Sequence, residues 1–238
     1  MSTEMSKLQT RYFDLDFIRG IAIVLMVVFH FCFDLNNFHF IDINIYHGAF
    51  WHYFRYVIVS LFLLCVGVSL YLVNESGYNF AKDLKRFFLI LANAMLVSAA
   101  SYVTFPHSFI YFGILHFIAF ASLFALAFVK FPKIALVAGI MIIVLSYENT
   151  VHMHWLYNIL QIPLHLPKHS EDLVPFTPWF GVVLVGIFIG YKKLFIFNTV
   201  QNSFTKKVAF LGKHSLLIYM LHQPILFGTV FSMHEILT

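Results

Sequence analysis

Charged residues are scarce in this chain of 238 residues: Asp, Glu, Lys and Arg make up 11% of it, whereas hydrophobic residues make up 61%. In soluble globular domains the charged residues approach a quarter of the total. The composition therefore excludes a water-soluble globular protein. It predicts an all-α polytopic membrane protein, because helices satisfy their own backbone hydrogen bonds in lipid.

Several other features are missing. The two cysteines, Cys32 and Cys65, both lie inside apolar runs, so no disulfide framework is indicated. No Walker, Rossmann or HExxH pattern is present. His152 and His154 are two residues apart and so do not share a helix face. We therefore expect no metal site and no permanently bound cofactor.

Apolar runs long enough to cross a bilayer occur seven times, and six of the seven prolines fall between these runs or at their ends, where helices are expected to stop. Pro224 alone lies inside a run. Gly186 and Gly190 in the sixth run suit close helix packing. No internal repeat is evident, so we expect one integral-membrane domain over residues 1–238. The runs lie at about 16–35, 51–73, 86–105, 110–129, 133–147, 178–197 and 210–232.

The positions of lysine and arginine predict the orientation of the chain. Eleven of these residues lie before the first run or in the loops that follow runs two, four and six, and Lys168 alone lies in a loop on the opposite side. Because cytoplasmic loops are enriched in Lys and Arg, the N-terminus is predicted to be cytosolic and the C-terminus outside. The net charge of +4 is thus explained by membrane orientation, and nucleic acid is not expected as a partner.

The first run places three ionisable residues inside an apolar helix. Arg19 and His30 are eleven residues apart, close to three full turns, so they share one stripe about 16 Å apart along the axis. Asp34 is one turn beyond His30 and within reach of its ring, where it would fix the tautomer. Asp16 is the expected partner of Arg19. Such groups in a membrane span are candidates for a functional site.

His116 and His222 lie inside the fourth and seventh runs. Each alone is typical of a structural histidine that is bonded to a neighbouring helix. Together with His30, they predict a shared polar centre contributed by three helices, with His116 and His222 in substrate binding.

Four segments together resemble one known family. RYFDLDFIRGIAIVLMVVFHFCFDL, at residues 11–35, resembles the opening of the transmembrane acyltransferase superfamily, and in particular bacterial relatives of the heparan-α-glucosaminide N-acetyltransferase catalytic domain. Residues 112–116 (FGILH), 175–181 (PFTPWFG) and 211–222 (LGKHSLLIYMLH) agree in a consistent order. The first motif is fairly specific, and the other three are apolar.

The resemblance implies an enzyme that moves an acetyl group from cytosolic acetyl-CoA, its co-substrate, to an amino or hydroxyl group of a sugar or glycan outside the membrane. It also implies a location in a bacterial inner membrane. Arg19 and His30 match the Arg-to-His spacing of the wider superfamily. The lysosomal members, however, have an asparagine where His30 stands, and their proposed catalytic histidine lies in the next outer loop before a tryptophan. His47, ahead of Trp51, is the nearest equivalent, so His30 and His47 both remain candidates.

The chemistry of acyl transfer fits the same residues. A hydroxyl or amine must lose a proton as it attacks the thioester, and histidine suits that role near neutral pH. Arg19, together with Lys82, Lys85 and Arg86 in the cytosolic loop, is expected to hold the phosphates of CoA. Transfer could be direct or could pass through an acetyl-histidine, and a homodimer is left open.

Two rival classes use the same kind of residues. A proton-coupled transporter also places Arg, Asp and His inside the membrane, but the seven runs show no inverted halves. A haem-binding electron carrier would need two histidines on facing helices. A Soret band in the absorbance spectrum of purified protein would identify the haem protein.

We predict that His30→Ala abolishes acetyl transfer because His30, oriented by Asp34, is the expected base. Assays of His30→Ala and His47→Ala test this assignment. If His30→Ala leaves transfer intact while His47→Ala abolishes it, the catalytic role belongs to His47.

Overall fold

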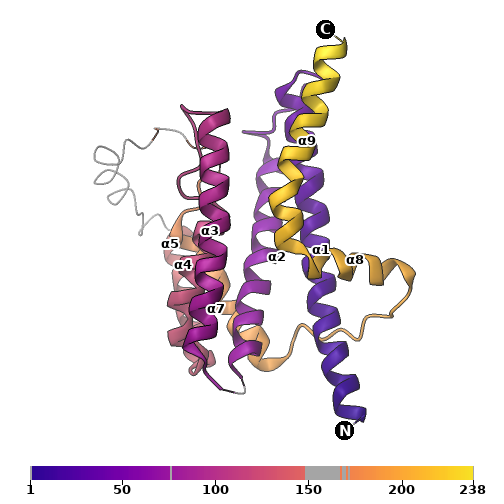
Figure 1. The fold of residues 1–238 in the computed structure, drawn as a ribbon. Coiled ribbons are helices and arrows are strands. Elements are labelled where there is room, and N and C mark those ends of the chain that lie inside the picture. The colour runs from indigo at the N-terminus through magenta and orange to yellow at the C-terminus, as the bar shows by residue number, and fades with distance from the viewer. Residues whose placement is uncertain (1, 76, 148–166, 168–169, 171, 238) are drawn as a thin grey trace. The chain divides into compact units, whose positions relative to one another are not determined.

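The structure is a computed structural model that describes residues 2–75, 77–147, 167, 170 and 172–237. All regular secondary structure in this part of the chain is helical (Figure 1). The helices are α1 (Ser2–Asn37), α2 (Ala49–Asn74), α3 (Phe80–Thr104), α4 (Ile114–Val129), α5 (Pro132–Tyr147), α7 (Phe176–Lys192), α8 (Ser203–Lys213) and α9 (Ser215–Leu237).

Each of the seven predicted runs corresponds to a helix. Four helices are long and apolar enough to cross a membrane: α1 from Phe13 to Asn37, α2, α3 and α9. The apolar helices α4, α5 and α7 are shorter, with 16, 16 and 17 residues. At 1.5 Å per residue they measure about 24 Å, somewhat less than a typical hydrocarbon core. The fold is a helical membrane bundle; the count of seven spans and their orientation stay predictions.

The last predicted run, 210–232, is wrong at its beginning. Residues up to Lys213 belong to α8, and α9 begins at Ser215. Between them His214 leaves the helical conformation, and its backbone N–H donates to the carbonyls of Phe210 and Leu211 at 3.2 Å. α8 is thus a separate helix of 11 residues. α9 itself continues through Pro224.

The chain divides into two compact units. Residues 1–62 and 195–238 form unit 1, and residues 63–194 form unit 2. Unit 1 contains α1, the first half of α2, α8 and α9, whereas unit 2 contains the rest of α2 with α3, α4, α5 and α7.

In unit 1, α1 and α9 run parallel and in contact (Figure 1). The contacts advance in the same direction along both helices: the ring of His30 meets that of His222, and one turn or two later Phe38 meets Phe227 and Phe231. A parallel first and last span is what an odd number of spans requires.

α8 crosses α1 where both helices carry glycine. A Cβ atom built on Gly20 would collide with the carbonyl of Val208, and one built on Gly212 would collide with the carbonyl of Asp16. The backbones therefore touch with no side chain between them. The connection that leads to α8 is held as well, since the buried carboxylate of Asp14 accepts the backbone N–H groups of residues 197, 198 and 199 at 3.0, 3.1 and 3.0 Å.

Helices in unit 2 also pack closely at glycine residues. Gly186 and Gly190 of α7 face α2: a Cβ on Gly186 would lie 2.6 Å from the carbonyl of Leu64, and one on Gly190 3.1 Å from the Cβ of Tyr71. The close packing that this glycine pair predicted is thus confirmed. Gly139 of α5 and Gly181 of α7 pack against each other similarly, with built Cβ atoms at 2.7 and 2.6 Å from the facing carbonyls.

We predict that Gly212→Ala destabilises the protein by about 1–3 kcal/mol, because the added methyl group forces α8 away from α1. Gly228→Ala is the matched control: it lies in α9 with nothing within 4 Å of a built Cβ, so it should be neutral or stabilising by up to about 1 kcal/mol. Thermal unfolding in detergent measures both. Equal midpoints for the two variants would contradict the backbone contact between α1 and α8.

Candidate functional site

Four polar side chains meet where α9 lies against α1. α1 supplies His30 and Asp34, which are one helical turn apart, and α9 supplies the adjacent residues His222 and Gln223. Asp34 is 1% exposed and His222 is 8% exposed. We call these four residues the α1–α9 cluster. The rings of His30 and His222 are in contact, whereas the shared centre of three histidines stays a prediction.

His222 has a defined proton position. Its Nδ1 lies 2.7 Å from the carbonyl oxygen of Tyr219, one turn earlier in the same helix. A carbonyl oxygen can only accept, so Nδ1 carries the proton and donates it. Nε2 of the neutral ring therefore has a lone pair, and this buried atom has no hydrogen-bond partner in the part of the chain that the structure describes.

Asp34 does not bond to His30, contrary to the sequence-based expectation. Its Oδ1 instead accepts from Nε2 of Gln223 at 2.9 Å, and its Oδ2 is buried with no partner among residues 2–75, 77–147, 167, 170 and 172–237. The i to i+4 spacing brought Asp34 within reach of His30, but Gln223 supplies an N–H donor that the carboxylate binds instead. Sequence reasoning missed Gln223, although an amide next to His222 inside an apolar run was a signal.

His30 contributes its ring to the cluster by packing. Its centroid lies 4.9 Å from that of His222 with the rings at 66°, and 5.6 Å from that of Phe29 with the rings at 88°. Both are edge-to-face arrangements. Within the described residues, no hydrogen bond fixes the tautomer of His30.

About three turns before the cluster in the same helix, Arg19 pairs with Asp16 as expected. Nη1 of Arg19 lies 2.7 Å from Oδ1 of Asp16, and both side chains are about three-quarters buried. Arg19 and the cluster therefore occupy two levels of α1, about 16 Å apart along its axis.

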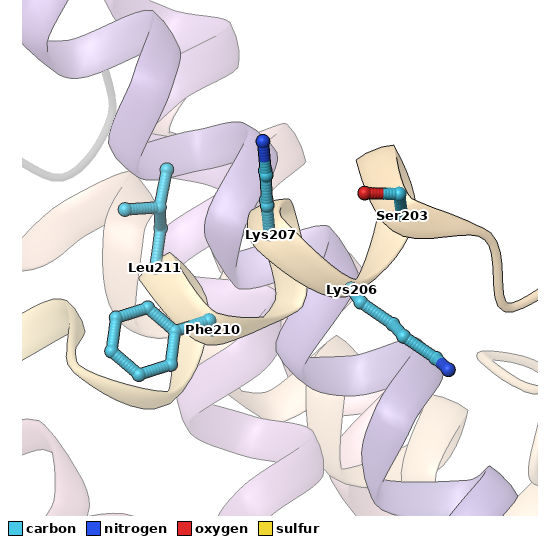
Figure 2. Close-up of a pocket in the computed structure, with 5 residues that line it drawn as sticks. All are labelled: Ser203, Lys206, Lys207, Phe210 and Leu211. Carbon is cyan, nitrogen blue, oxygen red and sulfur yellow. The ribbon is translucent and has the colours of Figure 1, made fainter.

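α8, which contacts α1 at Asp16, adds basic residues to this part of unit 1. A cavity of about 540 Å³ lies beside it, lined by Ser203, Lys206, Lys207, Phe210 and Leu211 (Figure 2). The two lysine side chains leave α8 in different directions in Figure 2. They therefore do not converge on a single anion.

His116 is in unit 2 and has protein partners on both ring nitrogens. The backbone N–H of Gly113 donates to Nδ1 at 3.3 Å, so the proton is on Nε2, which lies 3.4 Å from Oγ of Ser98. Ser98 in turn donates to the carbonyl of Ile110 at 2.5 Å. His116 thus caps the start of α4 and ties it to α3. This arrangement favours a structural histidine.

The remaining predicted residues lie in the segment before α2 or in unit 2. His47 is exposed in the segment between α1 and α2, where its backbone N–H donates to Asn44 at 3.1 Å. Lys82 is exposed and Arg86 half-buried at the start of α3, in unit 2. Unit 2 has a cavity of about 840 Å³ that Asn74, Glu75 and Lys130 help to line, but neither Lys82 nor Arg86 does.

No group of three or more His, Cys, Asp or Glu side chains is arranged to hold a metal ion in the part of the chain that the structure describes. His152 and His154 lie outside the described residues.

The comparison with known families decides between the classes that the sequence left open. The family model described as heparan-alpha-glucosaminide N-acetyltransferase, catalytic, matches residues 11–224. The chain belongs to this family. It is therefore an integral membrane protein and an enzyme of the acyltransferase type, with acetyl-CoA the co-substrate that the family implies. The match covers both units and ends just after Gln223. No curated protein and no solved structure matches the chain.

We predict that Gln223→Leu destabilises this member of the family by about 1–3 kcal/mol, because it leaves the Asp34 carboxylate buried with no hydrogen bond. Asp34→Asn should cost less, since the amide oxygen can still accept from Gln223. Chemical unfolding in detergent measures both. A larger loss for Asp34→Asn than for Gln223→Leu would contradict the bond between α1 and α9.

Proposed function

We propose that the protein transfers an acetyl group from cytosolic acetyl-CoA to an amino or hydroxyl group of a sugar or glycan on the outer side of a bacterial inner membrane. The observation that carries this proposal is the α1–α9 cluster, in which the half-buried His30 and the buried His222 are in ring contact, on a helix pair whose first member also carries Arg19. The family supplies the acyltransferase class.

The reaction needs a site for CoA near the cytosol and a site for acyl transfer deeper in the membrane, and α1 carries polar residues at both positions. At the level of Arg19, a guanidinium can bind phosphate oxygens of CoA. About 16 Å further along the helix, the histidines can serve the thioester that an extended pantetheine arm would bring to them. This arrangement allows a donor in the cytosol to meet an acceptor outside without either one crossing the bilayer.

The reaction at the cluster is an acyl exchange between two nucleophiles. The nitrogen or oxygen of the acceptor forms a bond to the carbonyl carbon of the thioester, and the bond from that carbon to sulfur breaks. A base must take the proton of the acceptor. The carbonyl oxygen gains negative charge and needs an N–H donor, which the ring of His30 can supply.

The central test is binding of acetyl-CoA by the purified full chain in detergent, measured by calorimetry. Arg19→Gln should weaken binding about tenfold or more, because a charge-assisted hydrogen bond is worth about 1.5–3 kcal/mol. Arg55→Gln is the matched control, since Arg55 is exposed on α2 in the same unit.

Tight binding that Arg19→Gln loses and Arg55→Gln keeps would support the proposal. A folded wild-type protein that binds neither acetyl-CoA nor a longer acyl-CoA would overturn it. Equal affinities of the two variants would remove Arg19 from the donor site.

A further inference from the structure

The α1–α9 cluster contains three buried polar atoms that have no hydrogen-bond partner among the described residues: Oδ2 of Asp34, Nε2 of His222 and Oε1 of Gln223. The carboxylate and amide oxygens are acceptors, and so is Nε2 of His222, because the proton of this ring is on Nδ1. A buried acceptor without a donor is costly. These three acceptor atoms therefore lack a donor, and a group that carries N–H or O–H would supply one.

An amine or a hydroxyl is such a group, and it is also the nucleophile of the proposed reaction. We infer that Nε2 of His222 is the atom that takes the proton of the acceptor substrate. Asp34 and Gln223 accept hydrogen bonds from the other N–H or O–H groups of that substrate. This inference rests on the proposed function.

His222, and not His30, is then the general base. A general base needs a fixed tautomer with its lone pair towards the nucleophile. His222 has one, since the carbonyl of Tyr219 holds the proton on Nδ1 at 2.7 Å. His30 has no such partner among the described residues, and the carboxylate expected to orient it bonds to Gln223. The carbonyl of Tyr219 thus fixes the tautomer of His222. This is the role that the sequence analysis expected Asp34 to have for His30.

The proton balance of the step is complete without another reactant. As the acceptor nitrogen or oxygen bonds to the carbonyl carbon, its proton moves to Nε2 and His222 becomes an imidazolium. The bond from carbon to sulfur then breaks, and the imidazolium gives the proton to the departing thiolate. The products are the acetylated acceptor and CoA, and His222 returns to its starting tautomer.

Gln223 is a positioning residue in this arrangement. It follows His222 directly in α9, and its bond to Asp34 fixes that turn of α9 against α1. The ring of His222 is thereby kept at 4.9 Å from that of His30.

The test is the rate of CoA release from saturating acetyl-CoA, followed with a thiol reagent, with glucosamine, glycerol or water alone as acceptor. His222→Asn is the informative variant, because its amide can still donate to the carbonyl of Tyr219 but has no basic atom. We expect its rate to fall about 100-fold or more while its affinity for acetyl-CoA stays within about twofold. His234→Ala, a histidine near the end of the same helix, is the matched control and should keep its rate. Added imidazole should restore His222→Ala in part.

The outcomes separate this inference from the proposed function. A wild-type rate that His222→Asn keeps to within about threefold would overturn the inference alone. So would imidazole rescue of His30→Ala but not of His222→Ala, which would make His30 the base. If folded wild-type protein releases no CoA with any of the three acceptors, the proposed function fails and the inference fails with it.

Discussion

A single hydrogen bond joins the first and last apolar helices at the level where the histidines meet. Nε2 of Gln223 donates to Oδ1 of Asp34 at 2.9 Å, across 189 residues of sequence. In lipid, an isolated carboxylate in a helix is costly, so the Asp34 side chain favours a neighbour that can donate to it. Because Gln223 is adjacent to His222, satisfying Asp34 also places His222 against His30. The stability of the helix pair and the geometry of the candidate site therefore depend on the same contact.

A different kind of interaction holds the middle of α1. There the backbones of α1 and α8 touch at Gly20 and Gly212, and the carboxylate of Asp14 binds three successive backbone N–H groups of the segment before α8. These contacts hold α8 beside the Arg19–Asp16 pair. The polar residues of α1 thus have separate roles, since Asp14 anchors a connection, Arg19 can bind an anion, and His30 and Asp34 belong to the cluster.

The helices were predictable from the sequence, because a helix that crosses a bilayer needs a long apolar run and because prolines mark where such helices end. The break at His214 was not, since residues on both sides of it are apolar enough to continue one run. Within the site, helical spacing predicted that Arg19 and His30 share one stripe of α1, and the interior histidines predicted a shared polar centre but not which of the rings would touch. The partner of Asp34 escaped prediction because the i to i+4 rule describes one helix, whereas Gln223 comes from another. The capping role of His116 likewise depends on Gly113 and Ser98, whose approach no local pattern announces.

The most direct test of this account is whether positions 30 and 222 are neighbours in the folded protein. His30→Cys and His222→Cys, combined in a background with Cys32→Ser and Cys65→Ser, place two thiols at the ring contact. A short bifunctional thiol reagent should cross-link this pair within one chain much faster than the pair His30→Cys and His234→Cys. Position 234 is about three turns beyond position 222 on α9. Fast cross-linking of the first pair alone is the predicted result. Equal rates for both pairs, or no cross-link at the first, would contradict a site built by α1 and α9.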